Sequence, residues 1–248
     1  MVILKSPKEI EKIRESNQIV AEILSILKAE IKPGVDTLYL DNLAEELAKK
    51  KKAVPAFKGY RGFPYSICAS VNQMVVHGFP SKQPLNEGDI LSIDFGTLYN
   101  GFYGDSAITV PVGKISKNAE RLSQITKESL FKGIEKAIPG GRLSDISNAI
   151  QTHVESAGYS VVRVFVGHGI GSKLHEEPQI PNYGSPGVGI RLKTGMTLAI
   201  EPMVNEKGPD VKILDDGWTA ITKDGGLSAH FEHTIAITEN GPDILSKR

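Results

Sequence analysis

Five side chains in strand-like or glycine-flanked segments of this chain could bind a metal ion. They are Asp94, Asp105, His168, Glu201 and Glu232, four carboxylates and one imidazole. An unpaired carboxylate inside an apolar segment is costly to bury and tends to take up a proton. Asp94 and Glu201 end similar apolar runs that are offset by 107 residues, from 85 to 192 and from 94 to 201. Acids at equivalent points of a repeat predict a cation shared between two halves of the chain.

The dipeptide Asn100-Gly101, flanked by aromatic residues, predicts a two-residue hairpin turn. Counting back from that turn places Asp94 opposite Ala107, with Asp105 two residues away on the same face. Two carboxylates this close repel each other and share a proton unless a cation separates them. The hairpin therefore predicts that Asp94 and Asp105 are neighbouring metal ligands.

The other two ligand segments have alternative interpretations. His168 lies between Gly167 and Gly169, which let backbone and ligand approach closely. A phosphate-binding loop is the alternative there, but the spacing of neither phosphate fingerprint is present. Glu232 lies in an alternating segment, 230–238, that predicts a strand. Taken alone it would be an ordinary residue of a surface strand, and the four other candidate ligands favour a metal ligand.

The ligand types indicate which metals and which reaction to expect. Carboxylates dominate the set and no thiolate belongs to it, which suits Mn, Fe, Co or Zn as divalent ions better than a thiolate-type structural zinc. Five ligands, some able to bridge, suit two metal ions. A two-metal site can supply a hydroxide nucleophile at neutral pH and polarise a carbonyl group. Hydrolysis is therefore the expected reaction class.

Together these motifs resemble those of the methionine aminopeptidases of the pita-bread fold. The matching segments include Ile93-Asp94-Phe95-Gly96, Gly167-His168-Gly169-Ile170-Gly171, His175-Glu176-Glu177-Pro178, Ile200-Glu201-Pro202-Met203 and Phe231-Glu232-His233-Thr234. The ligand set alone is shared with aminopeptidase P and prolidase relatives. The short interval from Glu201 to Glu232 leaves no room for the helical insertion of type II enzymes. The chain thus resembles a bacterial type I enzyme (peptidase family M24) without an N-terminal zinc-binding extension.

This resemblance implies a role for each candidate ligand. Asp94 would chelate one metal ion, and His168 and Glu201 would hold the other. Asp105 and Glu232 would bridge the two. Glu201 would also shuttle the proton during hydrolysis.

The resemblance also implies how the substrate is held. His175 would contact the substrate peptide and help to stabilise the tetrahedral oxyanion, and His77 would lie near the scissile amide. The pocket for the methionine side chain would be built from apolar or soft groups, as a thioether demands: Tyr60, Phe63, Cys68, Leu174 and Trp218. Cys68 as a nucleophile is a less economical alternative, and Trp218 as a plain core residue is another.

The expected function is removal of the initiator methionine from nascent proteins, with a preference for a small second residue. One alternative is an X-Pro aminopeptidase or dipeptidase of the same superfamily, although such chains usually carry an extra N-terminal domain. A second is a non-enzymatic binding protein on the same fold, although such relatives have lost ligands.

Composition is consistent with a soluble cytoplasmic protein. Lys plus Arg equals Asp plus Glu, so the formal net charge is zero and gives no support for nonspecific nucleic-acid or membrane binding. A single cysteine excludes an internal disulfide and suits a reducing compartment. No secretory signal and no span of roughly 20 apolar residues is expected. The partners expected are nascent chain N-termini near the ribosome, and a monomer is the simplest assembly.

The elements that must position these residues form two similar halves. Helices are predicted from Ser6 to the Pro33-Gly34 stop, over 37–50, over 116–137 and over 144–156. In each half, strands then lead to a His-Gly pair and to the apolar run that ends in the acid. The chain is therefore expected to be a single α+β domain, residues 1–248, with pseudo-repeats over roughly 1–110 and 111–248. The pita-bread fold implies internal pseudo-twofold symmetry and a curved antiparallel sheet flanked by helices.

Overall fold

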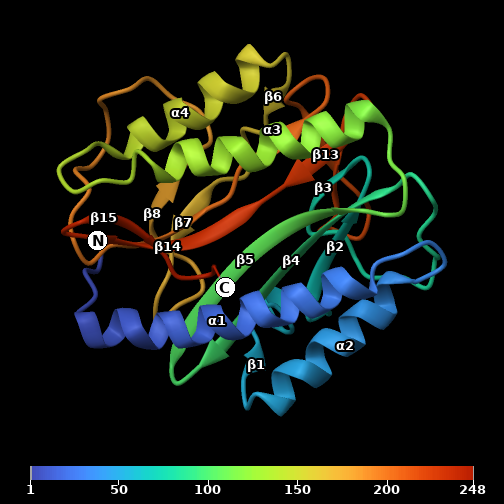
Figure 1. Ribbon diagram of the computed structural model, residues 1–248, viewed down its shortest axis with the longest axis horizontal. Helices are drawn as coiled ribbons and strands as arrows, with labels where there is room; N and C mark the ends of the chain where they lie inside the picture. Colours follow the sequence, from blue (N-terminus) through green and yellow to red (C-terminus); the bar gives the residue numbers. More distant parts are fainter. Residues whose placement is uncertain (1, 248) are drawn as a thin grey trace.

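A nine-stranded antiparallel sheet forms the centre of the computed structural model, which describes residues 2–247 (Figure 1). Its main path runs β1-β4-β5-β14-β9-β7-β8, while β2 pairs with β4 and β15 pairs with β14. The strands are β1 (Val54–Pro55), β2 (Ile67–Val71), β4 (Ile90–Tyr99), β5 (Phe102–Pro111), β7 (Gly167–Gly169), β8 (Glu176–Ile180), β9 (Thr197–Ile200), β14 (Glu232–Thr238) and β15 (Gly241–Ile244).

Two three-stranded sheets complete the β structure. One has the order β13-β10-β6 and the other β11-β12-β3. Their strands are β3 (Met74–Val76), β6 (Ser160–Val161), β10 (Met203–Asn205), β11 (Val211–Ile213), β12 (Ala220–Thr222) and β13 (Ser228–His230).

In the described part of the chain, four α-helices and a 3-10 turn accompany the sheets: α1 (Pro7–Glu30), α2 (Thr37–Lys50), α3 (Lys117–Ile134), α4 (Leu143–Ser156) and η1 (Tyr60–Gly62). Ser6, at the predicted start of α1, caps that helix in a capping box with Glu9, and Ser116 caps α3. The predicted range of α2 is confirmed, whereas α3 ends at Ile134 rather than at 137. Within residues 2–247, no helix combines the length and apolar character needed to cross a bilayer.

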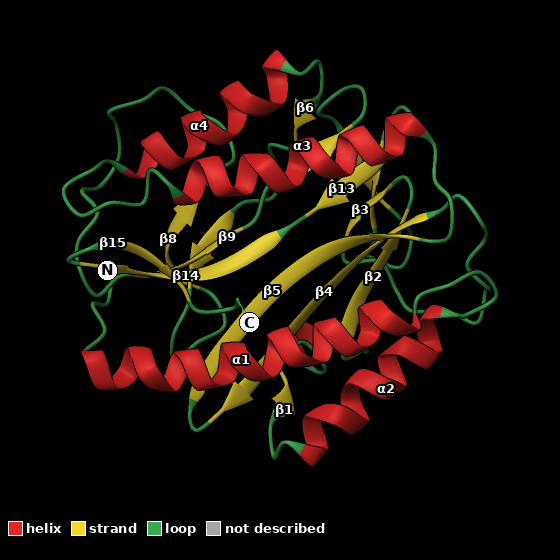
Figure 2. Cartoon of the chain, in the orientation of Figure 1, coloured by secondary structure: helices red, strands yellow, loops and turns green. Residues whose placement is uncertain are grey.

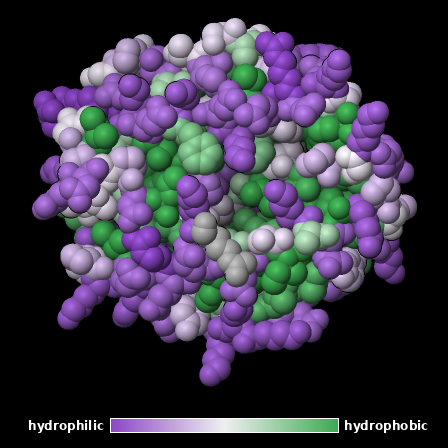
Figure 3. Space-filling model, viewed as in Figure 1, coloured by the Kyte–Doolittle hydropathy of each residue, from purple (hydrophilic) through white to green (hydrophobic). Residues whose placement is uncertain are grey.

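The helices pack in pairs on the two halves of the sheet. Figure 2 shows α1 and α2 along one side of the view and α3 and α4 along the other, with the strands between them. One core cluster joins α1 and α2 to β2 and β4, and a second joins α3 and α4 to β9 and β14. These clusters remove the hydrophobic faces of both helix pairs from water. On the face seen in Figure 3, hydrophilic side chains surround smaller apolar patches.

The two halves meet where β5 pairs with β14, and β4 and β9 lie on either side of that pair. The predicted register of the β4–β5 hairpin is confirmed, because Asp94 pairs with Ala107. One expectation was wrong: Asp94 lies in the middle of β4 instead of ending it, since the hairpin continues to Tyr99, whereas Glu201 directly follows β9. The expected strand over 230–238 is broken at Phe231 into β13 and β14, which belong to different sheets.

Candidate metal centre

Five consecutive positions of the large sheet, β4-β5-β14-β9-β7, each contribute one of the five candidate ligands. Asp94 and Asp105 project from the β4–β5 hairpin, Glu232 begins β14, Glu201 follows β9, and His168 lies in β7. All five line a single cavity of about 730 Å³. The two halves of the chain therefore contribute to one site at the seam between them.

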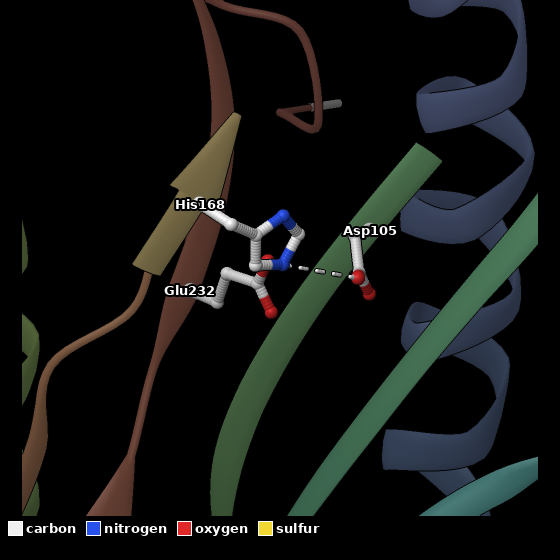
Figure 4. A group of neighbouring side chains, drawn as sticks. All are labelled: Asp105, His168 and Glu232. Atoms are coloured by element: carbon white, nitrogen blue, oxygen red, sulfur yellow. Dashed lines mark ion pairs between the residues drawn. The ribbon is translucent and has the colours of Figure 1, made fainter. Parts of the chain in front are cut away.

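The ligand atoms lie close together. One ligand atom from each of Asp105, His168 and Glu232 falls within 4.8 Å of the others, and Figure 4 shows these side chains converging from three strands. The Nε2 atom of His168 lies 3.5 Å from Oε1 of Glu201 and 4.0 Å from Oδ2 of Asp105. These separations leave room for a cation between the donor atoms.

Burial and mutual repulsion disfavour the charged form of these acids. Asp105 and Glu232 are 3% and 2% exposed, whereas Asp94 and Glu201 are partly exposed to the cavity. Burial raises the pKa of Asp94 to about 7. Burial, and then repulsion from the neighbouring acids, raises the pKa of Asp105, Glu201 and Glu232 well above the usual range.

Unsatisfied oxygen atoms show that this set of donors fits a metal. Among the described residues, Oδ1 of Asp94, Oδ1 of Asp105 and Oε1 of Glu232 are buried without a hydrogen-bond partner. Buried polar atoms in folded proteins nearly always have a partner, and each exception calls for an explanation. Divalent cations coordinated by these oxygens would satisfy them and offset the repulsion.

His168 is held in the form that binds metals. Its Nδ1 atom lies 2.9 Å from the carbonyl oxygen of Gly169, which can only accept, so Nδ1 carries the proton. The lone pair of Nε2 is thereby directed toward the carboxylates, and desolvation lowers the pKa of the ring to about 4. A Cβ on Gly167 would lie 2.4 Å from the carbonyl oxygen of Ala199, so glycine is required for β7 to approach β9.

Several supporting residues were not identified from the sequence. Thr234 Oγ1 donates to the backbone carbonyl of Asp105 at 2.8 Å, and Asn17 Oδ1 accepts from the backbone N–H of Asp105 at 3.2 Å. Asn182 Nδ2 donates to the backbone carbonyl of Glu201 at 3.0 Å. Asn17 and Asn182 lie far from the ligands in sequence, so only their buried positions reveal this function.

The cavity is lined by all five residues expected for a side-chain pocket, namely Tyr60, Phe63, Cys68, Leu174 and Trp218. The rings of Phe63 and Trp218 meet edge-to-face with centroids 5.1 Å apart. Burial raises the pKa of the Cys68 thiol well above its usual value, so a thiolate nucleophile is disfavoured. The pocket is therefore suited to an apolar side chain rather than to thiol chemistry.

Two histidines line the same cavity. The ring of His175 lies 4.3 Å from that of His168, centroid to centroid, and its Nδ1 is 2.7 Å from the Tyr60 hydroxyl. His77 has a left-handed backbone (φ 59°) and packs edge-on against Phe165. Desolvation lowers the pKa of His175 to about 3 and of His77 to about 4, so both rings are neutral donors at neutral pH.

Comparison with known proteins identifies the family of this chain. Residues 11–239 match the model of metallopeptidase family M24. The chain is 56% identical to the methionine aminopeptidase of Clostridium perfringens over 246 residues, 99% of each chain. The crystal structure of methionine aminopeptidase from Thermotoga maritima superposes with a TM-score of 0.98 at 50% identity, covering 100% of both chains.

A more distant match marks the wider superfamily. The prolidase of Pyrococcus horikoshii superposes with a TM-score of 0.79 at 26% identity, and the match covers 100% of this chain but 64% of that one. The narrower assignment rests on the methionine aminopeptidases, which match this chain over their full length and at higher identity. The chain belongs to metallopeptidase family M24 and, within that family, to the methionine aminopeptidases.

Proposed function

We propose that this protein hydrolyses the first peptide bond of polypeptides that begin with methionine. The proposal rests on one observation: the five candidate ligands and an apolar, aromatic pocket line the same cavity. Such a cavity accepts an uncharged side chain while the adjoining peptide carbonyl faces the acids. The full-length identity to methionine aminopeptidases supports methionine as that side chain.

Two divalent ions, Mn, Fe, Co or Zn, fit the proposed site. Asp94 would hold one ion, His168 and Glu201 the other, and the deeper acids Asp105 and Glu232 would bridge them. Bound there, the ions would supply a nucleophile derived from water at neutral pH and would polarise the scissile carbonyl. Glu201 is partly exposed in the cavity, where its carboxylate would accept a proton from the attacking water and deliver it to the leaving amine.

The histidines stabilise the charge that develops on the substrate. The Tyr60 hydroxyl lies 2.7 Å from Nδ1 of His175, and by donating to that atom it would keep the ring proton on Nε2, available to the carbonyl oxygen as it becomes negative. His77 lies on the wall beside Trp218, with ring centroids 6.2 Å apart, where it donates to the scissile amide region. Because both rings are neutral, neither repels the metal ions.

The substrates proposed are nascent chain N-termini in the cytoplasm, near the ribosome, with a small second residue. The protein is proposed to act as a monomer, without nucleic-acid or membrane binding.

Matched peptides test the activity. Metal-loaded protein should release methionine from Met-Ala-Ser much faster than it cleaves Ala-Pro-Ser, and a chelator should stop the reaction. Metal analysis of anaerobically purified protein gives the identity and number of the ions. Faster cleavage of Ala-Pro-Ser would instead support an X-Pro peptidase, the activity that the likeness to prolidase suggests.

A further inference from the structure

The segment that precedes α1 packs against the candidate site. The backbone N–H of Lys5 donates to the carbonyl of Gly195 at 2.7 Å, and Ile3 lines the cavity although it is 52% exposed. Lys5 itself is only 7% exposed, which is rare for a lysine unless its ammonium group is paired. The N-terminal segment therefore forms part of the wall of the site.

The partner of Lys5 is Glu176, and both side chains of this ion pair are 4% exposed. Lys5 Nζ also donates to the carbonyl of Ile3 at 3.1 Å, and the other carboxylate oxygen of Glu176 accepts from the backbone N–H of Lys173 at 3.2 Å. A Cβ on Gly171 would lie 2.5 Å from Cε of Lys5, so glycine makes room for the lysine.

Glu176 closes the loop that carries two residues of the site. Residues 170–175 connect β7 to β8; Leu174 and His175 are the two expected site residues of this loop, and Lys173 and Glu176 also line the cavity. The first turn of this loop is held by Gly171, whose carbonyl accepts from the backbone N–H of Tyr103 at 2.8 Å. At its other end the Lys5–Glu176 pair is the buried charged contact next to His175.

A buried ion pair contributes little net stability compared with apolar residues of the same size, because desolvating two charges offsets their attraction. It is, however, directional, and it leaves a buried charge uncompensated if one partner moves away. A pair of this kind therefore restricts a loop to one position more than it stabilises the whole fold. Restriction of this loop matters because misplacing a donor by about 1 Å can reduce turnover about a hundredfold.

We infer that Lys5 is a positioning residue for catalysis, which acts through Glu176 to hold His175 against the substrate carbonyl. This inference rests on the proposed function, because His175 is the group that is positioned. Lys5 itself does not touch the substrate. Its loss is expected to slow turnover without removing any metal ligand or pocket side chain.

A double-mutant cycle separates positioning from stability. Lys5→Met leaves the carboxylate of Glu176 buried without its partner, so it should lower the melting temperature. It should also lower kcat about tenfold or more and leave KM nearly unchanged. Lys5→Met/Glu176→Met removes both charges and should regain the melting temperature but not kcat. Lys5→Arg, which keeps the charge, should retain more activity than Lys5→Met. Lys8→Met, an exposed lysine of α1, is the matched control.

Hydrogen exchange gives a readout that does not depend on turnover. Amides of residues 171–175 should exchange faster in both methionine variants than in the wild type or in Lys8→Met, with bound metal per chain unchanged. A double variant with wild-type kcat and wild-type exchange in this loop would overturn the inference. Failure of the wild type to release methionine from Met-Ala-Ser would overturn the proposed function instead. The exchange data would still test whether the ion pair holds the loop in place.

Discussion

Individual carboxyl groups at the site have the opposite pH behaviour from surface acids. Burial raises the pKa of Asp94 to about 7, so the folded, metal-free protein keeps a proton that the unfolded chain has already released. The stability from that proton is fully present below about pH 4 and is lost as the pH rises through about 7. Asp105, Glu201 and Glu232 are shifted in the same direction.

We therefore expect Asp94 to make the metal-free protein less stable as the pH rises from about 4 to about 7, by up to about 1.4 kcal/mol per pH unit, because only the folded state retains its proton in that range. The buried histidines oppose this trend below about pH 6.5, because the unfolded chain then binds protons that the folded chain does not. Calorimetric melting in a chelator from about pH 4 to about pH 7 should compare the wild type with Asp94→Asn, which keeps the histidines and removes the Asp94 contribution. Equal changes of stability with pH in the two proteins would contradict the expectation.

The Tyr60 hydroxyl is the hydrogen-bond partner of His175 Nδ1, and by donating there it would fix the ring proton on Nε2. Tyr60→Phe removes the 2.7 Å contact between the tyrosine hydroxyl and Nδ1 and keeps the ring in the pocket. Because a net hydrogen bond is worth about 1 kcal/mol, kcat should fall about fivefold with little change in KM. Steady-state kinetics on Met-Ala-Ser tests this. Tyr65→Phe is the control, since Tyr65 packs on Phe63 and Phe79 outside the cavity lining.

Among the secondary-structure elements, the short strand β7 depends most on its close approach to the neighbouring strand β9. Gly167→Ala would place a Cβ 2.4 Å from the carbonyl oxygen of Ala199 on β9, so the two strands must separate. We expect a loss of about 1–3 kcal/mol in the free energy of unfolding and weaker metal binding, because His168 moves with its strand. Gly208→Ala meets only the end of the Asp224 side chain at 3.2 Å and serves as the control. Equal metal affinity by calorimetry in both variants would argue against this dependence.

Local signals in the sequence predicted most elements that position the site. The cap at Ser6 and the Asn100-Gly101 turn act over a few residues, so the start of α1 and the hairpin register could be predicted directly. The break at Phe231 could not, because it arises where β13 and β14 join different sheets.

Contacts between distant parts of the chain were the part that the sequence did not reveal. Lys5 and Glu176 are both common surface residue types, and nothing near either of them in sequence indicates that they pair in the interior. The contact of Asn182 with Glu201 could not be predicted for the same reason, because it forms only when the sheet has packed. The ligands themselves were recognisable because acids in apolar or glycine-flanked segments are unusual wherever they pack.

On the scale of the whole molecule, bound metal ions would connect the two halves. Asp94 and Asp105 come from the first half, and His168, Glu201 and Glu232 from the second, so metal bound between them is a cross-link. At 100 times its dissociation constant, a metal that binds only the folded state adds about 2.7 kcal/mol of stability.

The melting temperature should therefore rise with added Mn or Co and fall in a chelator. Asp105→Asn should remove that dependence, and it should also raise the melting temperature of the metal-free protein because the amide does not carry the cost of protonating a buried acid on folding. Asp210→Asn, an exposed acid, is the control. Scanning calorimetry at a series of metal concentrations gives both quantities. If the melting temperature of the wild type did not change in a chelator, the expectation that bound metal connects the two halves would be wrong.

The seam between β5 and β14 also has a consequence for folding kinetics. It pairs Ala107 with Glu232, residues separated by about half of the chain, and closing so long a loop is entropically costly and slow. The full ligand set exists only after this seam has formed, so metal capture comes at the end of folding. Metal ions should accordingly slow the unfolding rate and leave the refolding rate nearly unchanged.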